Sequence, residues 1–162
     1  AKELVKDVDD VSFCLSKALS CPVGSVLCGT SEFIENANRW RKMVGGGMRQ
    51  AGVLAAAGLV ALDTMIDRLA DDHANARRLA TGLANINGLT VDPESIQTNI
   101  VIFEVDPALG PSVKLISALD SEDVKVSSPG PTSIRMVTHR HISNEDVEET
   151  LSRTSKAVQS LR

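Results

Sequence analysis

Lys17 is the residue of this sequence with the clearest potential for covalent chemistry. It lies in the stretch SFCLSKALSCPVGSVLCG, residues 12–29, in a turn of small and apolar residues between two expected strands. An ammonium group pays a desolvation cost in such surroundings, and a lysine amine without its proton attacks carbonyl groups to form Schiff bases. A lysine that extends from a hairpin into solvent fits the same spacing, so the residue types leave both interpretations open.

A second candidate is a basic, glycine-rich segment, RWRKMVGGGMRQ at residues 39–50. It holds three glycines just before an expected helix, surrounded by Arg39, Arg41, Lys42 and Arg49. Backbone N–H groups and the dipole at a helix N-terminus attract anions, and guanidinium groups clamp them. The glycines match neither the Rossmann nor the P-loop spacing, so an anion site and a solvated basic face both stay open.

Arg135 lies inside the expected strand SIRMVTH, residues 133–139. Because side chains alternate along a strand, Arg135, Val137 and His139 should share one face. We expect Arg135 to be buried, and a buried guanidinium needs a carboxylate or phosphate partner. The sequence therefore indicates either an anion-binding arginine or an internal salt bridge.

Histidines and cysteines give weaker signals. His139 and His141 could chelate a metal from one strand face, but no further ligands lie nearby in the sequence, so we expect no metal site. The three cysteines, Cys14, Cys21 and Cys28, are odd in number and lack CxxC spacing. We therefore expect buried, free thiols in a reducing compartment, the cytoplasm.

Composition is that of an ordinary folded protein. The 162 residues are 43% hydrophobic and 23% charged, with a formal net charge of −4 and 2% aromatic residues. A mildly acidic chain with so few aromatic side chains is not expected to bind nucleic acid. The most apolar run, residues 53–62, is about half as long as the ~20 residues of a membrane span, so we expect no membrane partner.

Lys17 lies between two short apolar strands, which are expected at residues 11–15 and 23–28. Both strands are expected to be buried. Ser31 is the expected N-cap of a helix in which apolar residues at 33–40 recur at helical spacing and form one packed face. The glycines at 45–47 should end this helix, because they do not suit an element interior.

A long helical segment is expected from Met48 to the Asn-Gly pair that ends at Gly88. Its run AGVLAAAGLVAL, residues 51–62, is apolar all round and should be enclosed on every side. We expect a break or bend near Asp71. Further strands are then expected at 98–105, at 123–127 and at 133–139, followed by a closing helix with Ser143 as its N-cap.

Four stretches of the sequence resemble low-specificity L-threonine aldolases. They are residues 12–29, RWRKMVGGGMRQAGVLAAAGLVAL at 39–62, DRLADDHANARRLA at 67–80 and IRMVTH at 134–139. They follow the family's order and cover essentially the whole chain. The family depends on pyridoxal 5'-phosphate (PLP) and has fold type I, the fold of the aspartate aminotransferase superfamily. The resemblance implies an α/β fold, with 1–85 as the remainder of the large PLP-binding domain and 86–162 as a small C-terminal α+β domain.

The resemblance also implies roles for individual residues. Lys17 matches the lysine that binds PLP covalently, and Lys42 and Arg49 match basic residues near the cofactor phosphate. Arg135 matches the arginine that binds the substrate α-carboxylate. The implied enzyme is a lyase that cleaves L-threonine or L-allo-threonine to glycine and acetaldehyde, in threonine catabolism and glycine biosynthesis. Members of the family form homo-oligomers, usually homotetramers built from dimers.

The sequence departs from the family pattern at two points. Ala18 and Ser20 replace the glycines of the usual SKGLG, and wherever one of them needs a positive φ the cost is about 1 kcal/mol or more. An HxDGAR-type motif, whose aspartate pairs with the pyridine nitrogen and keeps the ring an effective electron sink, does not occur in this sequence. We therefore expect the chain to be the C-terminal half of a family member.

Three hypotheses about function follow. The chain is part of a PLP-dependent aldolase, or it is a truncated, non-catalytic oligomerisation or regulatory module. As a third alternative, it belongs to another PLP enzyme of the same superfamily, such as an aminotransferase. The stretches RWRKM and GGGMRQ favour the aldolase.

Overall fold

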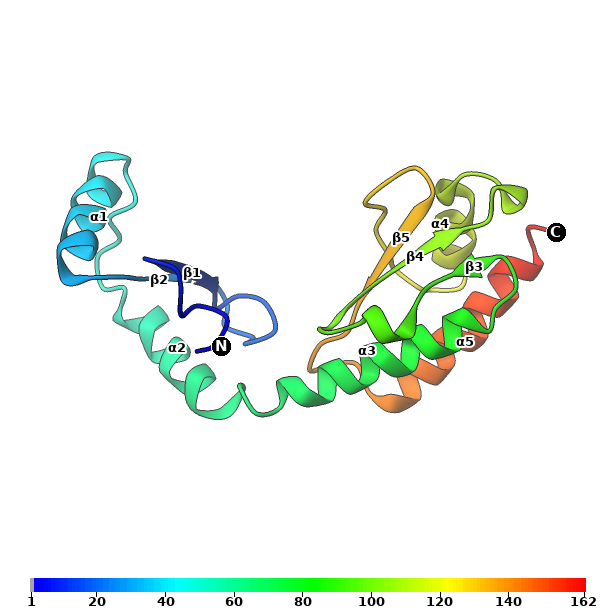
Figure 1. The fold of residues 1–162 in the computed structure, drawn as a ribbon, viewed down its shortest axis with the longest axis horizontal. Helices are drawn as coiled ribbons and strands as arrows, with labels where there is room; N and C mark the ends of the chain where they lie inside the picture. Colours follow the sequence, from blue (N-terminus) through cyan, green and yellow to red (C-terminus); the bar gives the residue numbers. More distant parts are fainter. Residues whose placement is uncertain (1) are drawn as a thin grey trace. The chain divides into compact units, whose positions relative to one another are not determined.

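The computed structural model describes residues 2–162, and the chain divides into two compact units, Ala1–Arg68 and Leu69–Arg162 (Figure 1). The first unit contains strands β1 (Val11–Cys14) and β2 (Ser25–Cys28) and helices α1 (Ser31–Met43) and α2 (Gly52–Thr64). The second contains α3 (Leu69–Ala84), β3 (Leu89–Thr90), β4 (Ile100–Val105), α4 (Ser112–Ser121), β5 (Ser133–Val137) and α5 (Asn144–Gln159). Two short 3₁₀ helices, Pro93–Ser95 and Pro107–Leu109, precede and follow β4.

The first unit is a two-stranded antiparallel hairpin beside a helix. Val11 of β1 lies opposite Cys28 of β2, and the two predicted strands are confirmed in place. Their predicted burial is wrong, because β2 is almost entirely exposed and β1 is at most half-buried. The buried cluster of this unit holds only Leu15, Cys21 and Ala61. The two strands cover one side of α2, and within the described part of this unit they have no second layer on their other face. Most of the surface of the hairpin therefore stays in contact with solvent.

The predicted packed faces of the two helices in this unit are also wrong. No residue of α1 is buried, and Trp40 is 61% exposed. In α2 only Gly58 and Ala61 are buried, although its sequence is apolar on every side. The N-cap of α1 is Thr30 rather than Ser31, since the Thr30 hydroxyl accepts a hydrogen bond of 3.3 Å from the Phe33 N–H.

The break predicted near Asp71 is present, and it lies at residues 65–68, between α2 and α3. Asp71 and Asp72 instead lie in the first turn of α3. Carboxylates are favourable there because they face the positive end of the helix dipole. Asp71 and Asp72 therefore support the start of α3.

The second unit is built on a three-stranded antiparallel sheet in the order β3-β4-β5. Helices α3 and α5 lie side by side against one face of the sheet (Figure 1). Burial alternates along β4, so Val101, Phe103 and Val105 face the core, whereas Ile100 and Ile102 are exposed. The sheet therefore has one packed face and one open face, as strand periodicity predicts.

Helix α5 begins where the sequence predicts. Ser143 is the N-cap, and its hydroxyl accepts a hydrogen bond of 3.1 Å from the Asp146 N–H. The Asp146 carboxylate in turn accepts a bond of 2.8 Å from the Ser143 N–H, which completes a capping box. These hydrogen bonds, chiefly the one from the Ser143 backbone, hold the pKa of Asp146 below its usual range.

Two strands differ from the prediction. Residues 123–127 form no strand, and only Ser127 makes a bridge to Arg135. The start of this segment is held away from β5, because Asp123 has a φ of 59° and the Val124 N–H donates to the Leu119 carbonyl. The two-residue strand β3 was not predicted, since a run of that length carries no periodicity.

The predicted division at residue 85 concerns the domains of the longer proteins that the sequence resembles, and it stays a prediction. In this chain α3 packs against β4 and α5 and so belongs to the second compact unit. None of the helices within residues 2–162 combines the length and the apolar character that a membrane crossing requires.

Candidate active site

The turn that carries Lys17 is held by three backbone hydrogen bonds. The Ser20 N–H donates to the Lys17 carbonyl over 2.8 Å, the Cys21 N–H to the Leu15 carbonyl over 3.1 Å, and the Leu15 N–H to the Gly24 carbonyl over 2.9 Å. Leu15 and Cys21 are buried, whereas Lys17 is exposed. Of the two interpretations left open for Lys17, the structure therefore has the lysine that extends into solvent. The apolar neighbours fill the core cluster and leave the amine accessible on a fixed turn.

Ser20, one of the two residues that depart from the SKGLG pattern, has a φ of 62°. Ala18, the other, does not have a positive φ. The predicted backbone cost therefore arises at Ser20 alone, because a side chain in the left-handed region costs roughly 1–2 kcal/mol.

Replacing Ser20 by glycine should therefore stabilise the first unit by roughly 1 kcal/mol, since glycine adopts this φ without strain. Urea unfolding followed by circular dichroism would measure the change. Ala18→Gly is the matched control, and it should give no gain because it only adds freedom to the unfolded chain. A Ser20→Gly protein that is less stable than the parent would contradict the strain at this position.

Cys14 lies at the end of β1, close to Lys17, and its thiol has a specific partner. Ser25, directly opposite on β2, donates a hydroxyl hydrogen bond to the Cys14 sulfur over 3.6 Å. This bond, together with the positive charge of Lys17, holds the pKa of Cys14 below its usual range. The prediction of buried thiols is right for Cys21, but Cys14 is half-buried and Cys28 is exposed.

Cys14 should therefore react with iodoacetamide at a lower pH than a free cysteine, because the thiolate is the nucleophile. The rate of Cys14 alkylation as a function of pH, followed by peptide mass spectrometry, would measure this. The inflection should lie below that of N-acetylcysteine, and Ser25→Ala should move it upward. A Ser25→Ala profile that coincides with the parent would contradict the role of the hydroxyl.

The basic segment surrounds the connection from α1 to α2. Arg39, Arg41, Lys42 and Arg49 are all exposed. Lys42 lies in the last turn of α1, which ends at Met43 before the predicted glycines. The first N–H groups of α2 receive no side-chain cap from its N-cap residue. The Val53 and Leu54 N–H groups donate instead to the Gln50 and Ala51 carbonyls, so what this segment offers an anion is its exposed lysine and arginine side chains.

Arg135 is exposed on the open face of the second unit's sheet, so its predicted burial is wrong. Alternation along β5 does place it on one face with Val137, but that face is the one that α3 and α5 do not cover. Its Nε donates to the Ser127 hydroxyl over 3.2 Å. Within residues 2–162 it forms no ion pair, so the guanidinium can bind a carboxylate.

The four predicted site residues are thus divided between the two units. Lys17, Lys42 and Arg49 belong to the first, and Arg135 belongs to the second. All four are exposed, and each is accessible to a ligand.

The two histidines lie beyond the end of β5 rather than on one strand. The His139 and His141 rings meet edge to face with centroids 5.6 Å apart. The backbone N–H of His141 donates to His139 Nδ1 over 3.3 Å. Over residues 2–162 no group of three histidine, cysteine, aspartate or glutamate side chains could hold a metal ion.

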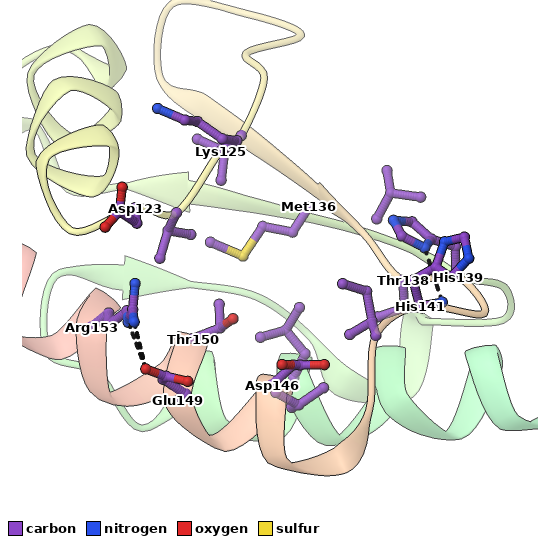
Figure 2. A pocket seen from close by; sticks show the side chains of 16 residues that line it. Asp123, Lys125, Met136, Thr138, His139, His141, Asp146, Glu149, Thr150 and Arg153 are labelled. Carbon is purple, nitrogen blue, oxygen red and sulfur yellow. Dashed lines mark hydrogen bonds and ion pairs between the residues drawn. The ribbon is translucent and has the colours of Figure 1, made fainter.

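Sequence reasoning missed a cavity of about 490 Å³ in the second unit, between the end of β5, α5 and residues 123–126 (Figure 2). None of the four predicted site residues lines it. The alternation of Val124 and Val126 with Lys125 predicts a strand. Nothing in that pattern indicates that the segment diverges from β5.

Comparison with known proteins identifies the family. Residues 1–106 match the family model described as "Beta-eliminating lyase". The chain belongs to this family.

Among curated members, it is 44% identical over 153 residues to "Probable low-specificity L-threonine aldolase 2" of Arabidopsis thaliana. The alignment covers 93% of this chain and 43% of that protein. It is 41% identical over 152 residues to "Low specificity L-threonine aldolase" of Escherichia coli O157:H7, covering 91% and 42% of the two chains. The resemblance to threonine aldolases is confirmed, and the chain spans less than half the length of these relatives.

Solved structures confirm the predicted fold for this beta-eliminating lyase family member. Serine palmitoyltransferase of Sphingomonas wittichii superposes with a TM-score of 0.78 at 24% identity, over 98% of this chain and 42% of that chain. A putative L-allo-threonine aldolase of Listeria monocytogenes superposes with a TM-score of 0.71 at 16% identity, over 96% and 46%. At such identities the likeness establishes the fold, the mixed α/β fold of type I PLP enzymes.

Proposed function

We propose that this chain is part of a PLP-dependent aldolase that cleaves L-threonine or L-allo-threonine to glycine and acetaldehyde. The observation that carries the proposal is the 44% identity to a threonine aldolase over 93% of the chain. The stretch concerned includes Lys17, which the structure exposes on a turn fixed by buried Leu15 and Cys21.

The donor set of the first unit fits PLP. Lys17 supplies an accessible primary amine, the group that bonds to an aldehyde. Lys42 and Arg49 supply exposed cations for a phosphate. When bound, PLP provides the electron sink that accepts the electrons of the broken Cα–Cβ bond.

Arg135 is the proposed partner of the substrate α-carboxylate. Its Nε is engaged by Ser127, which fixes the orientation of the guanidinium and leaves the terminal nitrogens to form a fork with a carboxylate. A carboxylate held at a fixed angle restricts rotation of the substrate, so that the bond to be broken keeps one orientation during the reaction.

Assembly belongs to the same proposal. We infer a homo-oligomer, a dimer or a homotetramer, acting in threonine catabolism and glycine biosynthesis in the cytoplasm. Exposed apolar side chains on α1 and α2 support an oligomer, because a surface of this kind is normally covered. They include Trp40, Val53, Leu59 and Val60.

A second candidate is a non-catalytic oligomerisation or regulatory module. It is favoured by the departure from the family pattern, since no HxDGAR-type motif occurs within these 162 residues. Another PLP enzyme of fold type I is the third candidate, favoured by the superposition on serine palmitoyltransferase.

The test is an assay of the purified 162-residue chain with added PLP and L-threonine. A visible absorption band on addition of PLP, together with glycine formation, would support the proposal in full. A band without glycine would support cofactor binding and favour the non-catalytic module. The absence of a band would contradict the PLP-dependent function, and glycine formation from L-serine or an acyl transfer product instead would favour the third candidate.

A further inference from the structure

The hydrogen-bonding edge of β5 opens onto the cavity described above. β5 is an edge strand of the sheet, paired with β4 on one side only. The even-numbered residues of β5 form the hydrogen bonds to β4. This follows from the register and from the flanking bond of 2.9 Å that the Thr138 N–H donates to the Asn99 carbonyl. The backbone groups of the odd-numbered residues therefore face the other way, toward the free edge.

Among the odd-numbered residues, the Ser133 carbonyl and both outward groups of Arg135 have partners. The Ser133 carbonyl accepts a bond of 2.9 Å from the Ser128 hydroxyl. Arg135 exchanges two bonds with Ser127, with lengths of 2.7 and 3.2 Å. Val137 is the next in the series, and over residues 2–162 its outward N–H and C=O have no partner. An unpaired edge of this kind is a template for another strand.

The segment that could cover this edge is held away from it. Val124 and Val126 are half-buried and Lys125 is exposed, which is the alternation of a strand. However, the Val124 N–H is bonded to the Leu119 carbonyl at the end of α4, over 2.9 Å. The segment is therefore attached to α4 at one end and to β5 through Ser127 at the other, and the cavity lies between it and β5.

We propose that an extended peptide strand of a partner protein binds in this cavity, pairs antiparallel with β5 at Val137, and continues the ladder that Ser127 begins. In an antiparallel pair, opposite residues share a face. The peptide residue opposite Met136 would therefore lie on the buried face, where the cavity is lined by Met136, Val147 and Thr150 (Figure 2). The residue opposite Val137 would lie on the open face. This is strand addition, in which main-chain bonds provide affinity and alternate side chains provide specificity.

The charges around the cavity favour a basic peptide. The two cations of the lining are neutralised, since Lys125 forms an ion pair with Asp120 and Arg153 forms one with Glu149. Asp123 forms no ion pair within the described chain, although its charge acts on both cations. The Asp146 carboxylate adds a second negative charge beside α5. The partner strand is thus expected to carry an apolar residue flanked by lysine or arginine.

The test uses an acetylated, amidated peptide of five residues that alternates lysine and valine, titrated into the 162-residue chain. Binding is followed by shifts of backbone amide signals in nuclear magnetic resonance spectra. The largest shifts are expected at Met136, Val137 and Thr150. A peptide with the same sequence but with methylated backbone nitrogens should bind about tenfold more weakly, because one lost hydrogen bond corresponds to about that factor.

Val137→Pro is the decisive protein variant. It removes the outward N–H without breaking a bond to β4, and proline is tolerated on edge strands in this orientation. It should weaken peptide binding by about tenfold, whereas Val137→Thr, which keeps the N–H and the branched side chain, should bind like the parent. Circular dichroism would show whether Val137→Pro folds, and if it does not, the methylated peptide decides the question.

Three results would overturn the proposal. They are equal binding of the methylated peptide, equal binding by folded Val137→Pro, and shifts that lie away from β5 and α5. A peptide in which glutamate replaces lysine and binds equally well would overturn the assignment of a basic partner.

Discussion

Replacing Lys17 by alanine is expected to abolish covalent capture of PLP by the chain. Sodium borohydride makes the bond between an aldehyde carbon and a lysine nitrogen permanent, so the label survives digestion and can be located by peptide mass spectrometry. In the parent chain the label should lie on the peptide that contains Lys17. The physical reason is that this amine is exposed on a turn held by three backbone hydrogen bonds.

The matched control for this prediction is Lys125→Ala. Lys125 is also exposed, but it belongs to the second unit and is paired with Asp120. Its removal should leave the label on Lys17 unchanged. A label spread evenly over exposed lysines, or one that persists in Lys17→Ala, would contradict the assignment of Lys17 without affecting the proposed peptide site on β5.

Truncating Phe103 to alanine is expected to have the largest effect on stability. Phe103 is 1% exposed and lies at the centre of β4, in the core formed with α3 and α5. Removing a buried aromatic ring costs roughly 3–5 kcal/mol, from lost burial and from the cavity left behind. This is a large part of the roughly 5–15 kcal/mol that stabilises a typical domain.

Urea unfolding of the Phe103→Ala protein would measure this loss as a lower midpoint at an unchanged slope. Ile102→Ala is the matched control, because Ile102 is the neighbour of Phe103 on the same strand but is 47% exposed on the open face. Its truncation should cost well under half as much. Similar losses for the two variants would show that the face of β4 assigned to the core is wrong.

The open face of the sheet in the second unit and the exposed helices of the first unit are both surfaces that we expect an assembly to cover. Arg135 and Val137 lie on a sheet face that no helix of the second unit covers, and α1 buries none of its residues. Apolar side chains on such surfaces are expected to be covered in an assembly. The chain spans less than half the length of these curated relatives.

Local signals in the sequence were sufficient for several elements and for the start of α5. Ser143 is the predicted N-cap, and with Asp146 it forms a capping box because both partners lie within one helical turn. The alternation of β4 predicts which of its residues are buried, since strand geometry has a period of two residues. The resemblance around Lys17, together with the glycine that Ser20 replaces, indicated both the family and the position of a strained φ.

Only the tertiary structure decided what surrounds these elements. The sequence of α2 is apolar on every side, but its burial depends on neighbours, and within the described residues Gly58 and Ala61 are its buried members. Lys17 is exposed because Leu15 and Cys21 take the interior positions of its turn. The Val124 N–H binds the carbonyl of Leu119 rather than β5, which leaves Val137 unpaired beside a cavity. Periodicity and capping act over a few residues, whereas burial and strand pairing depend on segments that are distant in the sequence.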